Sequence, residues 1–221
     1  VNDQYERFME ASTIVSYNPS GYTLGGSTSR ISGSVSDLAS DNGVYMVFRS
    51  YGSATVGQTL YAHQETTTIG GATYRLQTLT SADSAGTTLS VSGDTTGRKL
   101  TGKFVYQLTG VSSIPASTWT IYYRAIKSNP AIAAHCDVDI LIRQANGTIR
   151  TTIATNVANS GELTTAWSTL SGTYTWSAYT VVDQTDYLEV DYYIEVTTSS
   201  PGKTASLRID DNTLAIADQT R

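Results

Sequence analysis

The stretch that decides the fold is "HCDVDILIRQANGTIRTTIAT", residues 135–155, in which two runs of alternating side chains flank an Asn-Gly pair. Successive side chains of a strand point to opposite faces, and Asn-Gly suits a two-residue turn because both residues tolerate positive φ. The stretch therefore predicts a β-hairpin whose free cysteine packs in the core as a small hydrophobe. One face of the first strand carries Cys136, Val138, Ile140 and Ile142, and the other carries His135, Asp137, Asp139, Leu141 and Arg143.

The polar face of this hairpin gathers residue types that bind metals. His135, Asp137 and Asp139 could hold a divalent ion. However, same-face neighbours along one strand stand about 7 Å apart, which is too far for three of them to meet one ion without a bulge. The alternative is that both aspartates form ion pairs with Arg124 or Arg143 across the sheet.

The rest of the chain repeats this pattern of short strands and turns. Alternating runs that end at Gly, Pro, Asn or Asp predict strands at 73–79, 87–93, 98–110, 117–126, 166–176, 187–197 and 205–217. Apolar residues never recur at helical spacing over more than a turn or two. The sequence therefore predicts an all-β fold, an antiparallel β-sandwich or jelly roll with an N-terminal extended segment.

The domain organisation follows from where this pattern is clear. We expect residues 1–38 to be an N-terminal extension and residues 39–221 to be the jelly-roll domain. Residues 52–72 contain few large apolar side chains and predict a long loop or linker. A chain of 221 residues with 39% hydrophobic content is long enough for one large β-sandwich.

Composition excludes some partners. A net charge of -5, with 14 scattered Lys and Arg, disfavours a nucleic-acid partner. A single cysteine excludes an internal disulfide. No apolar run reaches the roughly 20 residues of a membrane helix. The chain begins "VNDQYERFMEAS" without an initiator Met, which is typical of a processed protein, and we expect secretion.

The run "YLEVDYYIEV", residues 187–196, alternates tyrosines and carboxylates on its outward face. Tyrosine rings stack on sugar rings, and carboxylates accept hydrogen bonds from sugar hydroxyls. Tyr187, Tyr193, Glu189 and Asp191 are therefore candidate glycan-binding residues. The alternative is a solvated or interface face. Glycoside hydrolysis ranks lowest, since it needs two carboxyl groups at a defined separation with one of them protonated.

The sequence "NGT" at Asn146 is the only Asn-x-Ser/Thr sequon. It coincides with the predicted turn, where an acceptor asparagine would be exposed. Asn146 is therefore a candidate glycosylation site, although the turn alone also explains these residues.

Two adjacent aspartates interrupt the closing strand in "LRIDDNTLA", residues 207–215. A desolvated carboxylate is costly unless it is paired or bound to a metal, and Ca²⁺ accepts such oxygens. Asp210 and Asp211 are therefore candidate ligands of a structural calcium ion. An Asx turn at the end of the strand is the alternative.

The segments "TWTIYYRAI", "CDVDILIRQANGT", "AWSTLSGTYTW", "TDYLEVDYYIEV" and "SLRIDDNTLAIADQT" together resemble the jelly roll of carbohydrate-binding modules, the galactose-binding-like fold. The resemblance covers about residues 72–218. It implies that an acid of the closing strand helps to hold a structural calcium ion, which points to Asp210 first and Asp211 second.

A second resemblance covers nearly the whole chain. The segment "SYNPSGYTLGGSTSRISGSVSDLASDNGVYMVFRSY", residues 16–51, followed by that jelly roll, resembles modules of large secreted archaeal cell-surface proteins. It implies an extracellular structural or adhesive role and no enzyme. Consistently, we find no Ser/His/Asp or Cys/His motif of recognisable spacing.

The leading hypothesis is a self-assembling cell-surface filament or sheath subunit, whose main partner is another copy of itself. Its N-terminal segment would add a strand to the next subunit. A non-catalytic carbohydrate-binding module is the alternative. The apolar residues expected to insert are Ile14, Val15, Tyr17, Tyr22 and Leu24.

Overall fold

The structure is a computed structural model that describes residues 13–14, 47–48 and 59–221. The chain forms two compact units, residues 1–52 and 53–221. Within the first unit, β1 (Thr13–Ile14) pairs antiparallel with β2 (Val47–Phe48). The predicted boundary at residue 38 lies outside the described residues.

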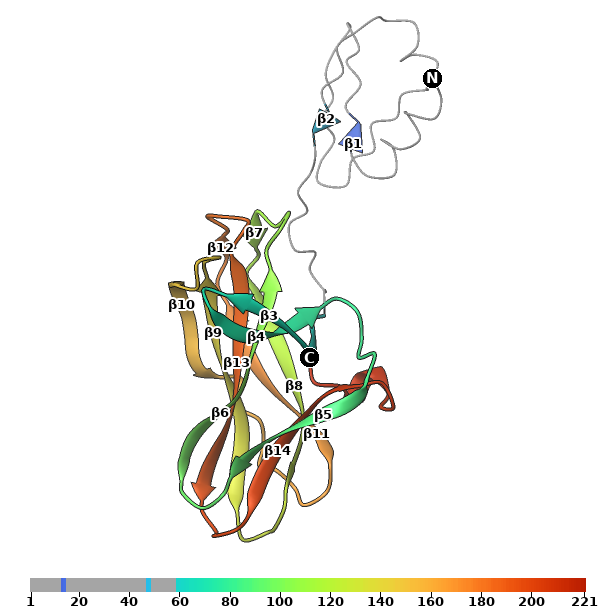
Figure 1. Ribbon diagram of the computed structural model, residues 1–221, viewed down its shortest axis with the longest axis vertical. Coiled ribbons are helices and arrows are strands. Elements are labelled where there is room, and N and C mark those ends of the chain that lie inside the picture. Colours follow the sequence, from blue (N-terminus) through green and yellow to red (C-terminus); the bar gives the residue numbers. More distant parts are fainter. Residues whose placement is uncertain (1–12, 15–46, 49–58) are drawn as a thin grey trace, which may run out of the picture. The chain divides into compact units, whose positions relative to one another are not determined.

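The second unit consists almost entirely of strands (Figure 1). Its described residues contain one short 3-10 turn, Ile216–Asp218, and no helix long and apolar enough to cross a membrane. Two short strands, β7 (Ser113–Ile114) and β12 (Tyr179–Thr180), pair with each other. The longer strands are β3 (Tyr61–Ile69), β4 (Ala72–Thr78), β5 (Ala85–Ser92), β6 (Gly97–Gln107), β8 (Ser117–Lys127), β9 (Ala133–Arg143), β10 (Ile149–Val157), β11 (Ser168–Trp176), β13 (Tyr187–Thr198) and β14 (Thr204–Asp211).

The longer strands form two sheets with jelly-roll topology. One sheet has the order β11-β8-β14-β5, and the other has the order β10-β9-β13-β6-β4-β3. Leaving out β3 and β4, the first strand pairs with the last (β5 with β14), the second with the seventh (β6 with β13), and so on inward to β9 with β10. All four pairs are antiparallel. This is the order of a long hairpin rolled into a sandwich, so the predicted fold class is confirmed.

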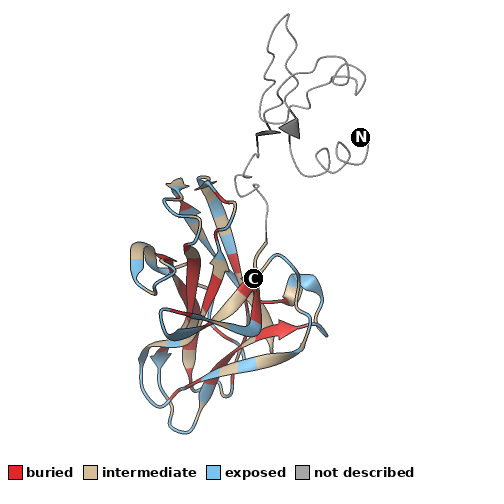
Figure 2. Ribbon diagram, turned by 45° about the horizontal axis from the view of Figure 1, so that its top comes forward, coloured by how far each residue is buried: buried red, intermediate tan, exposed pale blue. Residues whose placement is uncertain are grey.

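The core lies between the sheets, as strand alternation predicted (Figure 2). The predicted inward face of β9, including Cys136, is fully buried. Tyr192 packs edge-to-face against Phe104 and Tyr123, with ring centroids 5.1 and 5.9 Å apart. The predicted inward side chains of β13 are all buried as well: Leu188, Val190, Tyr192, Ile194 and Val196.

The prediction of a loop or linker at residues 52–72 is wrong for residues 61–69, which form β3. β3 and β4 form a hairpin, and β4 joins the six-stranded sheet by pairing parallel with β6. The hairpin turn reaches the β9–β10 turn: a Cβ atom at Gly70 would lie 2.3 Å from the carbonyl oxygen of Asn146. Few large apolar residues mark β3 because one side of it faces solvent, a situation that hydrophobic periodicity detects poorly.

The closing strand is shorter than predicted. β14 ends at Asp211, and residues 212–218 form turns and the 3-10 turn. Thr220 and Arg221 then return to the sandwich, where Ala62 donates a backbone hydrogen bond to Thr220 and Tyr122 bonds with Arg221.

Candidate functional site

Four chemically active side chains converge where β3, β14 and the β4–β5 loop meet, and we call them the Asp210 cluster: His63, Glu65, Asp83 and Asp210. One ligand atom from each lies within 4.8 Å of the others. Nδ1 of His63 is 3.3 Å from Oδ1 of Asp210, 3.5 Å from Oε2 of Glu65 and 3.8 Å from Oδ1 of Asp83. His63 and Asp210 are buried, whereas Glu65 and Asp83 are exposed. The site therefore combines a fixed inner pair with two adjustable carboxylates.

The tautomer of His63 follows from its other ring nitrogen. Nε2 lies 2.9 Å from the backbone oxygen of Thr80, which can only accept a hydrogen bond, and 2.9 Å from the Thr78 hydroxyl. Nε2 therefore carries a hydrogen. In a neutral ring, Nδ1 then presents its lone pair to three carboxylates. That arrangement is unfavourable unless a proton or a cation lies between them.

Asp210 is held from several directions. Its carboxylate accepts hydrogen bonds from the backbone N–H groups of Gln64 and Asp83 and from the Ser84 hydroxyl. Its backbone has φ of 52°, in the left-handed region that non-glycine residues seldom adopt. Among the described residues, no Lys or Arg forms an ion pair with Asp210, Glu65 or Asp83. The cluster therefore has three carboxylates and, at most, one protonated imidazole.

The structure separates the two aspartates that the sequence paired as calcium ligands. The buried carboxylate of Asp211 forms an ion pair with Arg208, with Oδ2 2.5 Å from Nε, and accepts hydrogen bonds from the backbone and hydroxyl of Thr213. Burial acts to raise the pKa of Asp211, but the Thr213 hydrogen bonds and the Arg208 charge leave it below the usual value. Asp211 thus forms the Asx turn weighed as the alternative, while Asp210 faces the cluster.

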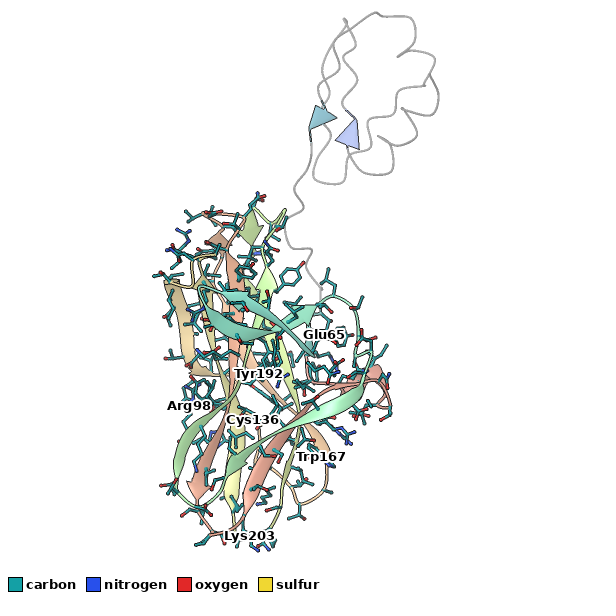
Figure 3. All side chains as sticks on the ribbon, in the orientation of Figure 1. Glu65, Arg98, Cys136, Trp167, Tyr192 and Lys203 are labelled. Carbon is teal, nitrogen blue, oxygen red and sulfur yellow. The ribbon has the colours of Figure 1, made fainter. Side chains whose placement is uncertain are left out.

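A different charged network covers the outer face of the six-stranded sheet, the face turned away from the core. Arg98 donates to Asp137 at 2.5 Å and to Asp139 at 3.1 Å, and its guanidinium lies 3.5 Å from the ring centre of Tyr193. The predicted pairing of these aspartates with Arg124 or Arg143 is wrong, because β13 and β6 bring Arg98 across from β9. Figure 3 shows Arg98 and Glu65 in separate parts of the domain.

The second half of this outer-face network is centred on two acids of β13. Glu189, fully buried, is paired with Arg143 at 3.0 Å and lies 3.6 Å from Lys103, which is 3.1 Å from Asp191. Burial, together with the nearby charge of Glu189, raises the pKa of Asp191 to about 7. Tyr74 of the β3–β4 hairpin faces Arg143 and helps to bury these groups.

This network bears on the candidate glycan-binding residues. Glu189 and Asp191 are buried and already bonded to cationic side chains. Arg98 covers one face of Tyr193, and Tyr187 packs beside the small apolar cluster of the hairpin. The four residues therefore share the outer face, but they are engaged with protein groups. This geometry gives little room for a sugar to stack and bond.

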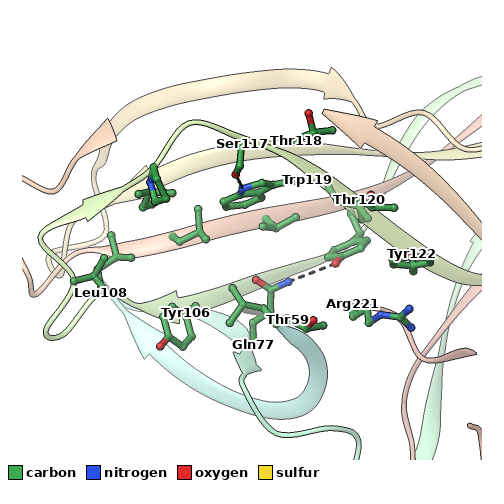
Figure 4. A pocket seen from close by; sticks show the side chains of 18 residues that line it. Thr59, Gln77, Tyr106, Leu108, Ser117, Thr118, Trp119, Thr120, Tyr122 and Arg221 are labelled. Atoms are coloured by element: carbon green, nitrogen blue, oxygen red, sulfur yellow. Dashed lines mark hydrogen bonds between the residues drawn. The ribbon is translucent and has the colours of Figure 1, made fainter. Parts of the chain in front are cut away.

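A cavity of about 470 Å³ lies beside β8, and we call it the β8 groove. Apolar and aromatic side chains dominate its lining, among them Trp119, Leu108 and Val190 (Figure 4). Gln77 donates to the Tyr192 hydroxyl at 3.4 Å, while its own buried side-chain oxygen has no hydrogen-bond partner within the described residues.

On the edge of β8 that faces this groove, no described residue pairs with the backbone of residues 117 to 121. β11 pairs with β8 from residue 117 to residue 125, but β14 pairs with it only from residue 124 to residue 127. Tyr122 exchanges two backbone hydrogen bonds with Arg221 on the β14 side. Alternate residues direct their backbone groups to the same edge, so Thr118 and Thr120 face that side too, where no described strand pairs with them. The sheet thus has a gap one strand wide.

The remaining predicted residues lie elsewhere. Asn146 is exposed in the β9–β10 turn, where its side-chain oxygen accepts a hydrogen bond from the Thr148 backbone, as a turn residue. Of the five residues expected to insert into a neighbour, Ile14 lies in β1 and pairs with Val47. The other four, Val15, Tyr17, Tyr22 and Leu24, lie outside the described residues.

Sequence reasoning missed His63, Glu65, Asp83 and the open edge of β8. His63 and Glu65 stand two positions apart, a spacing that puts them on one face once the segment is read as a strand. Assigning residues 52–72 to a linker concealed this signal. No pattern in the nearby sequence marks Asp83 or the open edge of β8. Both depend on the course of β14, which carries Asp210 next to Asp83 and separates from β8 before residue 121.

Comparisons with known proteins add little. No protein-family model matches the chain, and no curated protein matches its sequence. The solved "Structure of infectious bursal disease virus Gt strain" is similar over 93% of this chain and 44% of that chain, at 13% identity and a TM-score of 0.33. The Gx strain structure is similar over 65% and 37%, at 9% identity and 0.25. The chain thus spans less than half the length of either match, and likenesses so distant carry no argument about function.

Proposed function

We propose that this chain is an extracellular structural protein, a subunit of a self-assembling cell-surface filament or sheath whose copies are joined by N-terminal strand donation. The observation that carries the proposal is the open edge of β8 above the β8 groove. The resemblance of residues 16–51 to modules of secreted archaeal surface proteins supports the extracellular setting.

The β8 groove has the dimensions and chemistry of a strand position. Five extended residues rise about 16 Å, the length of the open stretch from residue 117 to residue 121. An inserted strand would bond to the backbone groups of Thr118 and Thr120, which pair with no described residue on this edge, and offer a donor to Gln77. It would also bury the apolar lining. Proteins seldom leave such an edge uncovered, because it pairs with other chains.

The proposed occupant is the N-terminal segment of a second copy. Its run "STIVSY", residues 12–17, combines β-branched and aromatic residues that suit a strand. Main-chain hydrogen bonds would provide affinity, and alternate side chains would provide specificity. We place the segment antiparallel to β8, in line with Thr220 and Arg221, which already occupy the neighbouring positions.

Electron microscopy of the full chain and of a variant lacking residues 1–30 tests the function. The full chain should form filaments or sheets, and the truncated chain should remain monomeric. Val15→Asp should block assembly, whereas Ser16→Asp, its matched control on the opposite strand face, should permit it. Ordered polymers of the truncated chain would refute strand donation, and a strictly monomeric full chain would refute self-assembly.

Hydrogen exchange locates the acceptor. The amides of Thr118 and Thr120 should exchange rapidly in the monomer and become protected in the assembly. Amides on the other edge of β8, such as that of Ile121, pair with β11 and should be protected in both states. Assemblies in which the Thr118 and Thr120 amides still exchange rapidly would mean that the accepting edge lies elsewhere.

The finer resemblance to carbohydrate-binding modules has less support. It rests on the jelly-roll fold, whereas the residues that would contact a sugar are bonded to Arg98, Arg143 and Lys103. Retention of the full chain on a polysaccharide column, lost in Tyr193→Ala, would favour the glycan-binding alternative over the structural one.

A further inference from the structure

The Asp210 cluster is the site in the described residues whose charge is least balanced. Its three carboxylates carry three negative charges, and His63 can offset only one of them. Other buried carboxylates are treated differently: Asp137 meets Arg98, and Asp211 meets Arg208. Asp210 is as buried as these, yet a single imidazole is its ion-pair partner in the described part of the chain. A buried carboxylate without a cation is costly.

His63 supplies an independent observation. Its side chain is 97% buried, and its Nδ1 points among the three carboxylates without a hydrogen bond to any described residue. Its Nε2–H is directed to the backbone oxygen of Thr80. Metal-binding histidines are commonly oriented in this way, because the second nitrogen bonds to a carbonyl and fixes the tautomer.

From these contacts we propose that His63, Glu65, Asp83 and Asp210 bind one divalent transition-metal ion of the Zn²⁺ or Mn²⁺ type, and not the calcium predicted from the sequence. Ca²⁺ takes oxygen ligands, whereas a ring nitrogen beside carboxylates suits first-row transition metals. This inference is independent of self-assembly.

The geometry needs only a small adjustment. Ligand bonds of about 2.1 Å in a tetrahedral site separate the ligand atoms by about 3.4 Å. The buried pair, His63 Nδ1 and Asp210 Oδ1, is already 3.3 Å apart. Glu65 and Asp83 have side chains that are 49% and 70% exposed, so both can turn toward the ion. Asp211 contributes nothing, because Arg208 and Thr213 hold its carboxylate.

A bound ion would join segments that are distant in sequence. Asp83 and His63 each follow a residue that bonds to the C-terminal segment: Ala82 donates to Gln219, and Ala62 donates to Thr220. Metal binding should therefore raise the melting temperature and slow exchange of the Ala62 amide.

The test is metal binding by the full chain, measured by isothermal titration with ZnCl₂, MnCl₂ and CaCl₂ separately. We expect Zn²⁺ or Mn²⁺ to bind with one ion per chain and at least about tenfold more tightly than Ca²⁺. Co²⁺ should give the visible absorption of a site with a nitrogen ligand. The chain as purified from its own cells should carry the same metal by mass spectrometry.

Two sets of variants make the test specific. Glu65→Gln changes an exposed side chain and should weaken metal binding at least about tenfold without loss of fold. His63→Ala should abolish it, and His135→Ala, the chain's other histidine, should leave it unchanged. Tighter binding of Ca²⁺, binding of no metal, or equal binding by Glu65→Gln and the parent chain would each overturn the proposal.

Discussion

Two groups of acidic side chains in this sandwich are neutralised in different ways. The outer-face network matches each buried carboxylate with an arginine or lysine. The Asp210 cluster instead sets three carboxylates around one imidazole. The comparison shows that burial alone does not identify a functional acid. The partner of the carboxylate decides whether it is a candidate binding group. A guanidinium of the protein neutralises the carboxylate beside it, whereas a buried carboxylate without such a partner needs a proton or a metal ion.

The largest effect should come from removing a cation of the outer-face network. Arg143→Ala leaves Glu189 buried without its guanidinium, and breaking a buried pair costs about 3–5 kcal/mol. Urea denaturation should show this loss of unfolding free energy with or without chelator. Arg75→Ala, which removes a half-buried arginine that forms no ion pair with a described carboxylate, is the control. A loss no larger than that of the control would mean that the network contributes nothing.

Arg98→Met should have the next largest effect, about 2–3 kcal/mol, because it leaves Asp137 buried and unpaired. The arginine is partly exposed, so water offsets part of the loss, and the methionine keeps some packing on Tyr193. Thermal unfolding measures it. The loss of melting temperature caused by Arg98→Met should be the same with and without metal; a loss that depended on metal would mean that the two groups are not separate.

Asp211→Asn should cost less, about 1–2 kcal/mol, since it weakens one turn and one ion pair. The pKa of Asp211 is lowered in the folded chain. Its contribution is therefore present above the ordinary aspartate pKa and is lost as the pH falls through the lower folded value. Denaturation at pH 7 and at a series of acidic pH values should show the difference between parent and variant shrinking as the pH falls. Equal metal affinity of parent and variant would separate Asp211 from the Asp210 cluster.

The smallest effect, and one of opposite sign, belongs to Asp191. Its pKa is raised to about 7, so the folded chain binds a proton that the unfolded chain releases near pH 4. Stability from this group is present below pH 4 and is lost as the pH rises through about 7. Asp191→Asn should be slightly more stable than the parent at pH 8, because loss of the ion pair with Lys103 offsets much of the gain from removing a buried charge, and it should match the parent near pH 4. The raised pKa of Asp191 would be contradicted if the unfolding free energy of the parent, relative to that of Asp191→Asn, increased from pH 5 to pH 8.

Much of the fold could be predicted because it follows from the alternation of apolar and polar side chains along each strand. The hairpin around Asn146-Gly147, the inward face of β9 and the inward face of β13 were correct, although φ is positive at Gly147 and not at Asn146. β3 was missed because its outward residues are polar and its inward ones few. The candidate site was half predicted: Asp210 stands out as an acid in a closing strand, but nothing near it in sequence announces His63.

By itself, the sequence determined most of the strands and their inner faces, the buried cysteine and the absence of an internal disulfide, because a period of two and turn residues are local properties. Tertiary structure alone decided which cation meets which acid, and where β14 leaves β8 to open an edge over a groove. Those outcomes depend on register between strands far apart in the chain. Asp210 and Asp211 make the point most directly, because two identical neighbours acquire different partners once the sheet is assembled.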